Sequence, residues 1–341
     1  MESVTRILCY GLGPIGCHIV RIAHARPGLE IVGAVDVDPA KIGRDVGQVA
    51  GLREEMGIRV AQSLAEIGSA SRAELAIQAT TSSLSDLMPQ LEELFKAGLR
   101  VVSTSEELSY PNAQDPDLGK KIDVLAKQCG VAVLGTGVNP GFAMDTLVLA
   151  LTGVCADIHR IDVFRVVDSS TRRVQLQVKT GAGLSVAEFE KRASEGKIRH
   201  IGLEESLAMV ADHIGWKLDR TESSIEPVVA EKVVRSTDIL VPVGNVAGVR
   251  QCQKGISCEK ALITMNLEIS IGAPNPCDHI VIRGSPDIDM VITGGIQGDI
   301  ATAAIAVNAI PRVMTAAPGL LNMAELPLVF ARVGESSAVR N

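Results

Sequence analysis

Three glycines near the N-terminus form the most distinctive chemical pattern of the sequence. Gly11, Gly13 and Gly16 have G-x-G-x-x-G spacing, and they stand where a predicted first strand passes into a helical pattern. The first glycine permits a tight turn, the second lets the backbone approach a pyrophosphate, and the third lets the helix pack on the strand. The next two residues, Pro14 and Ile15, are also predicted cofactor contacts; N–H groups at a helix start face such an anion, and Ile15 has one, whereas Pro14 can contact the cofactor only through its ring or carbonyl.

An acidic residue follows this turn at the end of the second predicted strand. Asp36 lies twenty residues after Gly16, where a carboxylate can accept hydrogen bonds from the adenosine ribose. Its charge would repel a 2′-phosphate, so NAD is the expected cofactor and NADP the alternative. Lys41 and Arg44 could soften that preference, although solvated surface charges are their commoner role. Isolated glycines also mark ordinary turns, and the strand, helix and acidic residue together favour a dinucleotide site.

More polar residues follow the later strands, at the edge where open α/β sheets bind ligands. Thr80, Thr81 and Ser82 come after the fourth predicted strand and are expected to line the cofactor's path, with a helix cap as their alternative role. Glu106 and Glu107 come after the fifth strand, where one carboxylate can act as a general base. Alternatively, the two glutamates lie in the first turn of a helix, where their negative charge offsets the positive end of the helix dipole.

The elements that position these residues alternate between strands and helices. Strands are predicted near 4–10, 30–36, 57–61, 74–80, 100–104 and 131–135, in the rhythm of βαβ units. A helical pattern of apolar residues runs from Leu84 to Phe95, where Pro89 is tolerable only in the first turn. The fold class is therefore predicted as α/β, a Rossmann doubly wound parallel sheet over residues 1–140.

The pattern changes after residue 141. Strands become longer and alternate apolar with polar residues, most clearly from Ile263 to Ile271. We predict an inserted α+β domain over 141–296, with an open, largely antiparallel sheet for substrate binding and for contact with a second subunit in a homodimer. A helix over 299–307, followed by Pro311, is predicted within a C-terminal segment, 297–341, that completes the first domain.

The composition excludes several classes of protein. The 341 residues carry 40 acidic and 33 basic side chains, a formal net charge of −7, which disfavours nucleic acid as a partner. The longest apolar stretch, 142–156, is too short to span a membrane, so no membrane association and a cytoplasmic location are expected. Cysteines and histidines show no metal-ligand spacing, and no metal site is predicted.

Several segments carry more specific motifs. They are GLGPIG at 11–16, STSEELSYP at 103–111, GTGVNPGF at 135–142, RVVD at 165–168 with LQVKTGAG at 176–183, and GGIQGDIA at 294–301. Together they resemble the 2,4-diaminopentanoate dehydrogenase family and the native amine dehydrogenases, and the match spans nearly the whole chain. The N-terminal domain resembles the dihydrodipicolinate-reductase type.

The resemblance implies NAD(P)-dependent interconversion of a primary amine with a ketone and ammonia. It implies that one carboxylate of the Thr-Ser-Glu-Glu motif is the acid/base group, and we favour Glu106 over Glu107. It also implies that Asn139, whose Asn-Pro-Gly context otherwise predicts a plain turn, orients the substrate. Arg165 could hold a substrate carboxylate bidentately or form an ion pair, for instance with Asp168.

Two positions depart from the family pattern. Gln297 stands where the family often has histidine, and Val167 stands in place of a polar pocket residue. Both leave the identity of the substrate open. Two rival functions are an imine reductase like dihydrodipicolinate reductase, whose paired-histidine motif is missing here, and a non-catalytic NAD(H)-binding redox sensor.

Overall fold

The computed structural model describes residues 4–68 and 72–332, and the chain divides into two compact units. Unit 1 comprises Met1–Phe142 and Gln297–Asn341, and unit 2 comprises Ala143–Ile296. The C-terminal segment thus belongs to the same unit as the glycine motif. No helix in the described ranges combines the length and apolar character that a bilayer crossing would need.

Unit 1 is built on a parallel seven-stranded sheet. Its strand order is β15-β6-β5-β4-β1-β2-β3. The strands are β1 (Thr5–Tyr10), β2 (Leu29–Val35), β3 (Val60–Ala61), β4 (Leu75–Gln78), β5 (Arg100–Ser103), β6 (Ala132–Gly135) and β15 (Gly319–Leu321). The chain reverses its winding direction between β1 and β4, and ligands of open α/β sheets bind at such a switch point. The predicted Rossmann α/β fold is confirmed.

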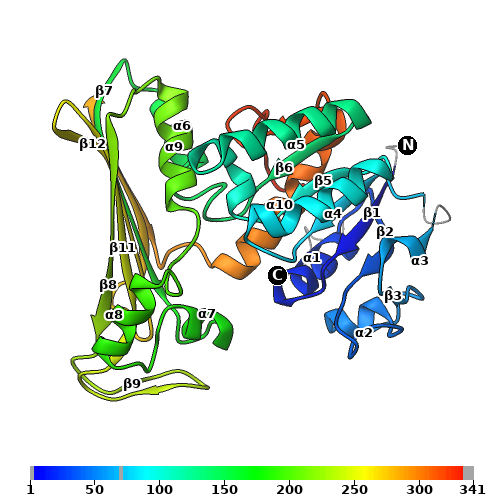
Figure 1. Cartoon of the computed structure of the whole chain (residues 1–341), viewed down its shortest axis with the longest axis horizontal. Helices are drawn as coiled ribbons and strands as arrows, with labels where there is room; N and C mark the ends of the chain where they lie inside the picture. Colours follow the sequence, from blue (N-terminus) through cyan, green and yellow to red (C-terminus); the bar gives the residue numbers. More distant parts are fainter. Residues whose placement is uncertain (1–3, 69–71, 333–341) are drawn as a thin grey trace, which may run out of the picture. The chain divides into compact units, whose positions relative to one another are not determined.

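Helices cover both faces of this sheet (Figure 1). They are α1 (Pro14–His24), α2 (Val46–Ala50), α3 (Leu64–Ile67), α4 (Leu84–Lys96), α5 (Pro116–Cys129) and α10 (Gly298–Thr315), with short 3-10 helices η2 (Glu107–Ser109) and η3 (Pro111–Ala113). Alternate residues of β1 point to opposite faces: Ile7 and Cys9 lie in the core that includes α1 and α10, whereas Leu8 packs with α4 and α5. Burial raises the pKa of the Cys9 thiol to about 12.

Two prolines lie deeper inside helices than the sequence predicted. Pro89 is the sixth residue of α4, beyond the first turn, and α10 runs through Pro311 to Thr315 rather than ending before it. Each proline lacks a backbone N–H and costs a helix about 3 kcal/mol in isolation. Burial of the apolar faces offsets that cost, since Leu87 and Leu91 of α4 and Ile310 of α10 are fully buried.

Unit 2 is an α+β unit with a six-stranded sheet. The strand order is β14-β13-β7-β12-β11-β8, and every neighbouring pair is antiparallel except β7 with β12. The strands are β7 (Asp157–Asp168), β8 (Arg220–Val229), β11 (Val246–Ser257), β12 (Lys260–Ser270), β13 (Cys277–Ser285) and β14 (Ile288–Thr293), with a separate β9 (Val234–Arg235) and β10 (Leu240–Val241) pair. Its helices are α6 (Thr146–Thr152), α7 (Val174–Lys179), α8 (Val186–Ser194) and α9 (Leu203–Ile214).

Candidate active site

The glycine loop after β1 has the geometry that its motif predicts. Gly11 has a φ of +93°, and a Cβ there would lie 2.6 Å from the carbonyl oxygen of Ala79. A Cβ at Gly16 would lie 1.9 Å from the carbonyl oxygen of Gly11, so α1 can approach the loop only with glycine there. At Gly13 a Cβ would meet no atom within 4 Å. Gly11 and Gly16 are thus required by packing, whereas Gly13 leaves an open cradle that fits a pyrophosphate.

Asp36 is tied to this loop by its own carboxylate. One oxygen, Oδ2, accepts the Leu12 N–H at 2.7 Å and lies 3.2 Å from Nζ of Lys41, while Oδ1 accepts the Asp38 N–H at 2.9 Å. Lys41 also lies 3.4 Å from Asp38. Partial burial opposes the charged form of Lys41, but the two aspartates outweigh it and raise the Lys41 pKa. Arg44 instead donates to the carbonyl of Ala40.

A buried glutamine links the ends of β4 and β5, and no motif in the sequence marks it. The side chain of Gln78 is fully buried; it accepts a short hydrogen bond from the Ser103 hydroxyl and donates one to Oγ1 of Thr80. Ser103 Oγ in turn accepts the Ser105 N–H at 3.0 Å. The chain of bonds fixes the loop that carries Glu106 relative to the loop that begins at Thr80. Its signal was a polar residue ending the apolar strand Leu75–Gln78.

The loop after β4 supports the loop after β5 through its backbone. The carbonyl of Ser82 accepts the Ser105 hydroxyl at 3.0 Å and the Glu107 N–H at 3.3 Å. Thr81 accepts the Ser83 N–H through its hydroxyl at 3.2 Å. Of the three residues predicted to line the cofactor path, Ser82 thus bonds the loop after β5 directly and Thr80 is connected to it through Gln78, whereas the Thr81 bond lies within its own loop.

The two adjacent glutamates have different environments. Oε2 of Glu107 accepts the Leu84 N–H at 2.7 Å, which satisfies one of the unpaired donors at the start of α4. Glu106 is half-buried, and its carboxylate has no hydrogen bond or ion pair to any residue of the described ranges. Glu107 thus takes the helix-terminal role that was the alternative for the pair, and the Glu106 carboxylate does not share that contact.

The loop after β6 brings Asn139 to the same edge of the sheet. Asn139 is buried, and the neighbouring Val138 N–H donates to Oγ1 of Thr302 in α10 at 3.2 Å. A Cβ at Gly135 would lie 2.3 Å from the backbone of Leu108, so this loop packs directly on η2, which follows Glu106. Gln297 caps α10 by accepting the Ile300 N–H at 2.8 Å.

Arg165 lies in unit 2 and is paired within that unit. Its guanidinium forms a short ion pair with Asp278 and donates to the carbonyl of Ile296 at 2.7 Å. The second oxygen of Asp278 accepts the Ile296 N–H at 2.7 Å. Only 4% of Arg165 and 2% of Asp278 is exposed, so both charges depend on each other for compensation. The partner is Asp278 rather than Asp168, whose carboxylate accepts hydrogen bonds from Ser170 and Gly272.

Comparison with known proteins identifies the family to which these features belong. Residues 142–341 match the model of the 2,4-diaminopentanoate dehydrogenase C-terminal domain, and residues 5–115 match the dihydrodipicolinate reductase N-terminus. The chain belongs to the 2,4-diaminopentanoate dehydrogenase family. It is an NAD(P)-dependent oxidoreductase of the class that acts on amine donors.

Individual relatives agree with this family. The dehydrogenase is 33% identical over 344 residues to the 2,4-diaminopentanoate dehydrogenase of Acetoanaerobium sticklandii, with 98% of this chain and 96% of that protein covered. It is 23% identical to an amine dehydrogenase of Streptomyces virginiae, with 96% and 98% covered. The solved amine dehydrogenase of Mycobacterium smegmatis, 24% identical, has the same fold, with a TM-score of 0.87 over 97% of this chain and 98% of that one.

Proposed function

We propose that this dehydrogenase interconverts a primary amine with a ketone and ammonia, with Glu106 as its acid/base residue. The observation that supports the assignment is the contrast between the two glutamates: Glu107 is engaged at the start of α4, whereas Glu106 has no partner in the described ranges. Both follow β5, at the edge of the sheet that carries the glycine cradle.

The reaction needs one proton-transfer group near the reacting carbon. In the deaminating direction, the carboxylate of Glu106 takes a proton from the substrate ammonium, because a protonated amine cannot release hydride. NAD(P), which the loop of Gly11, Gly13 and Gly16 would hold, would supply the hydride acceptor. Glu106 then activates water for attack on the resulting iminium carbon, and the products are the ketone, ammonia and NAD(P)H. In the aminating direction the same proton transfers run in reverse, so Glu106 protonates the hydroxyl that leaves as water.

The remaining predicted site residues bind and orient. Gly11, Gly13, Pro14, Ile15 and Gly16 would hold the pyrophosphate, with Asp36 at the ribose and Thr80, Thr81 and Ser82 beside the cofactor's path. Asn139 would orient the amine or carbonyl of the substrate. Two nitrogens of Arg165 donate to Asp278 and Ile296, and its remaining N–H groups are the predicted contacts for a substrate carboxylate. The relative in A. sticklandii is a 2,4-diaminopentanoate dehydrogenase, and that diamine is the substrate we propose to test first.

We also propose that the cofactor is NAD in preference to NADP, and that the protein is a cytoplasmic homodimer. The negative charge of Asp36 disfavours a 2′-phosphate. All seven cysteines are unpaired thiols, as is typical of a reducing compartment.

The proposed dimer contact is one face of the unit 2 sheet. Phe164 and Val291 lie on this face and are 37% and 52% exposed, and a second subunit could cover them. Sedimentation of wild type and Phe164→Asp tests the dimer: the variant should be monomeric, and a monomeric wild type would contradict it.

The proposed activity is tested by following NADH and NADPH oxidation with ammonia and a panel of ketones that includes 2-amino-4-oxopentanoate. Ammonia-dependent oxidation with at least one ketone is expected. Cofactor binding without turnover on any ketone would favour the redox sensor, and ammonia-independent reduction of a cyclic imine would favour the reductase.

The cofactor site has its own matched pair of variants. Gly13→Ala places a methyl group in the open cradle, so it should fold normally and lose NADH affinity by about tenfold or more. Gly16→Ala collides with the Gly11 carbonyl and should instead lower the free energy of unfolding. Fluorescence titration measures the NADH affinity of each variant, and thermal unfolding measures its stability. A Gly13→Ala variant that binds NADH like wild type would contradict the proposal that the cofactor binds at Gly13.

A further inference from the structure

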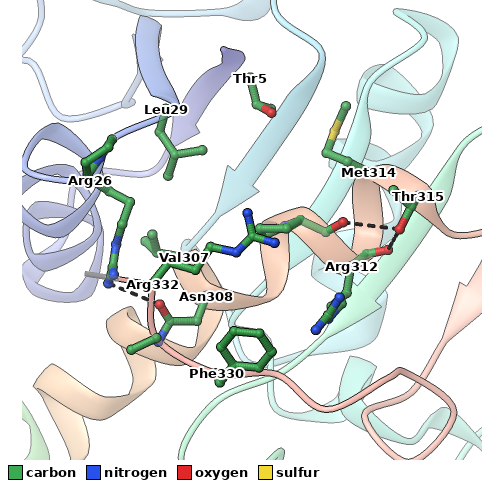
Figure 2. A pocket seen from close by; sticks show the side chains of 14 residues that line it. Thr5, Arg26, Leu29, Val307, Asn308, Arg312, Met314, Thr315, Phe330 and Arg332 are labelled. Atoms are coloured by element: carbon green, nitrogen blue, oxygen red, sulfur yellow. Dashed lines mark hydrogen bonds between the residues drawn. The ribbon is translucent and has the colours of Figure 1, made fainter. Parts of the chain in front are cut away.

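Gln78 lies at the edge of the unit 1 sheet that carries the predicted site. It ends β4, and Glu106 follows the end of β5, the next strand in the sheet. The opposite edge, where β1 and β2 begin at Thr5 and Leu29, instead borders a cavity of about 810 Å³ (Figure 2). Because parallel strands all end at one edge, Gln78 belongs with the glycine loop and the two glutamates.

The side chain of Gln78 is a polar group in an apolar place. The other residues of β4 are Leu, Ala and Ile, and none of the four residues is more than 1% exposed. A buried amide costs free energy unless its polar atoms are hydrogen-bonded. The contribution of Gln78 therefore depends on the groups that it bonds.

The Gln78 amide bonds three side chains at once. Its oxygen accepts the Ser103 hydroxyl, and its nitrogen donates to Oγ1 of Thr80 and to Oε1 of Gln90, the last at 3.1 Å. Both N–H groups and the carbonyl of the amide are thus engaged. Thr80 lies against the glycine loop, since a Cβ at Gly11 would be 2.7 Å from its Cγ2 atom. One branch of these bonds therefore ends beside the predicted cofactor.

Ser103 connects Gln78 to the backbone beside Glu106. Its Oγ accepts the Ser105 N–H at 3.0 Å, so its own hydroxyl hydrogen is the one donated to Gln78. Ser103 and Ser105 are 0% and 1% exposed, so solvent has little access to these bonds. A fully bonded buried network holds its members in one arrangement. The position of the Ser105 N–H, one residue before Glu106, therefore depends on the Gln78 amide.

The backbone of Glu106 is held from both sides. The Ser105 hydroxyl and the Glu107 N–H both donate to the carbonyl of Ser82, at 3.0 and 3.3 Å. The carbonyl of Glu106 itself accepts the Ser109 hydroxyl at 2.6 Å and the Ser109 N–H at 3.1 Å. With its backbone fixed in this way, the Glu106 carboxylate moves chiefly by rotation about its side-chain bonds. Its reach from the sheet edge is then set by the bonds that hold this loop.

We propose that Gln78 is a positioning residue of the reaction, whose amide sets the distance between the Glu106 carboxylate and the cofactor loop. One branch of its bonds runs through Ser103 to the Ser105 N–H, and the other ends beside the glycine loop. The inference rests on the proposed function, in which Glu106 transfers the proton. A displacement of about 1 Å between reacting groups can cost about 10²-fold in rate.

The test removes the amide and keeps the length of the side chain. Gln78→Met retains an unbranched side chain but has no N–H donor and only a weakly accepting sulfur. The kcat for reductive amination should fall by about ten- to a hundredfold, whereas the Michaelis constant of the ketone should change by less than about threefold. Amide hydrogen exchange of residues 103–109, measured without cofactor, should become faster, because the bonds that hold this segment are weakened.

A second substitution separates positioning from general support of the fold. If Gln78 acts through Glu106, then Gln78→Met lowers kcat in wild type but causes no further loss in Glu106→Gln. Gln251→Met is the matched control, because Gln251 is also a buried glutamine, bonded to the backbone of His200 in unit 2. It should lower the thermal midpoint of unfolding but keep the wild-type kcat and the wild-type exchange of residues 103–109.

Two results would overturn this inference. One is a wild-type kcat in Gln78→Met, and the other is an equal fold-loss in the wild-type and Glu106→Gln backgrounds, which would indicate a structural role. If Gln78→Met does not fold, Ser103→Ala interrupts the same branch with the loss of a single oxygen, and the same two results decide. Turnover by Glu106→Gln at the wild-type rate would instead overturn the proposed acid/base residue, and this inference with it.

Discussion

The carboxyl edge of the unit 1 sheet and the buried ion pair of unit 2 both contain charged side chains that the sequence marked as candidates. In unit 2, Arg165 and Asp278 are almost completely buried, and each has the other and the backbone of Ile296 as partners. In unit 1, Glu106 is half-buried and has no partner in the described ranges, although Glu107 beside it does.

On the function we propose, the difference separates charges that maintain the fold from a charge that takes part in the reaction. Removing one partner of a buried ion pair leaves the other charge uncompensated, which lowers the free energy of unfolding. The main role of such a pair is therefore structural. A carboxylate held by a rigid loop but left without a partner can bind and release a proton on a substrate. Four predictions test this distinction, from the largest expected effect to the smallest.

The largest effect is expected at the two glutamates. Glu106→Gln should reduce kcat for reductive amination by about 10²- to 10⁴-fold, because the amide cannot transfer a proton, while NADH affinity stays unchanged. Glu107→Gln is the matched control and should chiefly lower stability, because its carboxylate bonds the start of α4. Steady-state kinetics and thermal unfolding of both variants decide. Loss of turnover only in the Glu107 variant would place the acid/base residue one position later.

A large loss of stability is expected at the buried ion pair. Arg165→Met leaves Asp278 charged and unpaired, which should lower the free energy of unfolding by about 3–5 kcal/mol. Arg165→Met combined with Asp278→Leu removes both charges and should recover much of that loss. Urea unfolding measures the stability. The Michaelis constant of the double variant then tests substrate binding: a raised value in a stable protein supports contact between Arg165 and a substrate carboxylate, and an unchanged value argues against it.

An intermediate effect is expected at Asp45, which precedes α2. Its buried carboxylate accepts backbone N–H groups from Gly47, Gln48, Met56 and Gly57. Burial alone would raise the Asp45 pKa, but these hydrogen bonds outweigh it and lower the pKa below 3.8. Asp45→Asn should therefore cost about 2 kcal/mol at neutral pH. The stabilisation is fully present above the ordinary pKa and disappears as pH falls through the lower, folded value.

Measurement of the unfolding free energy of wild type and Asp45→Asn between pH 7 and strongly acidic pH checks that dependence. The two curves should run parallel at higher pH and converge in acid. A difference that grows as pH falls would show that the carboxylate does not act in its charged form.

The smallest effect is expected at Lys41, a charge that is only partly engaged. Nζ of Lys41 lies 3.2 Å from Asp36 and 3.4 Å from Asp38, so it offsets part of the negative charge expected near the adenosine ribose. Lys41→Gln should raise the Kd of NADPH relative to that of NADH by about two- to fivefold. Arg44→Gln, on the same turn, is the control. A ratio that stays constant in the Lys41 variant would remove this residue from cofactor selection.

The sequence by itself determined the elements whose signals are local. The strand and helix patterns predicted the parallel sheet and the added α+β unit, and the glycine spacing predicted the tight turn between β1 and α1. These predictions are confirmed, because tight turns, amphipathic helices and buried strands impose their residue types over short stretches of chain. That this turn and Asp36 bind the dinucleotide stays a prediction. The positions of the two prolines inside α4 and α10 were not predicted. Locally a proline destabilises a helix, and only burial of the helix in the tertiary structure offsets that cost.

Only the tertiary structure decided what distant side chains do to one another. The sequence left Glu106 and Glu107 as alternatives, and it was the Leu84 N–H, over twenty residues away, that engaged one and not the other. In the same way, Arg165 forms its ion pair with Asp278, which lies 113 residues later in the sequence. Gln78 forms hydrogen bonds with both Thr80 and Ser103. A hydrogen bond or ion pair depends on positions within a few ångströms, and a one-dimensional order of residues does not contain those distances.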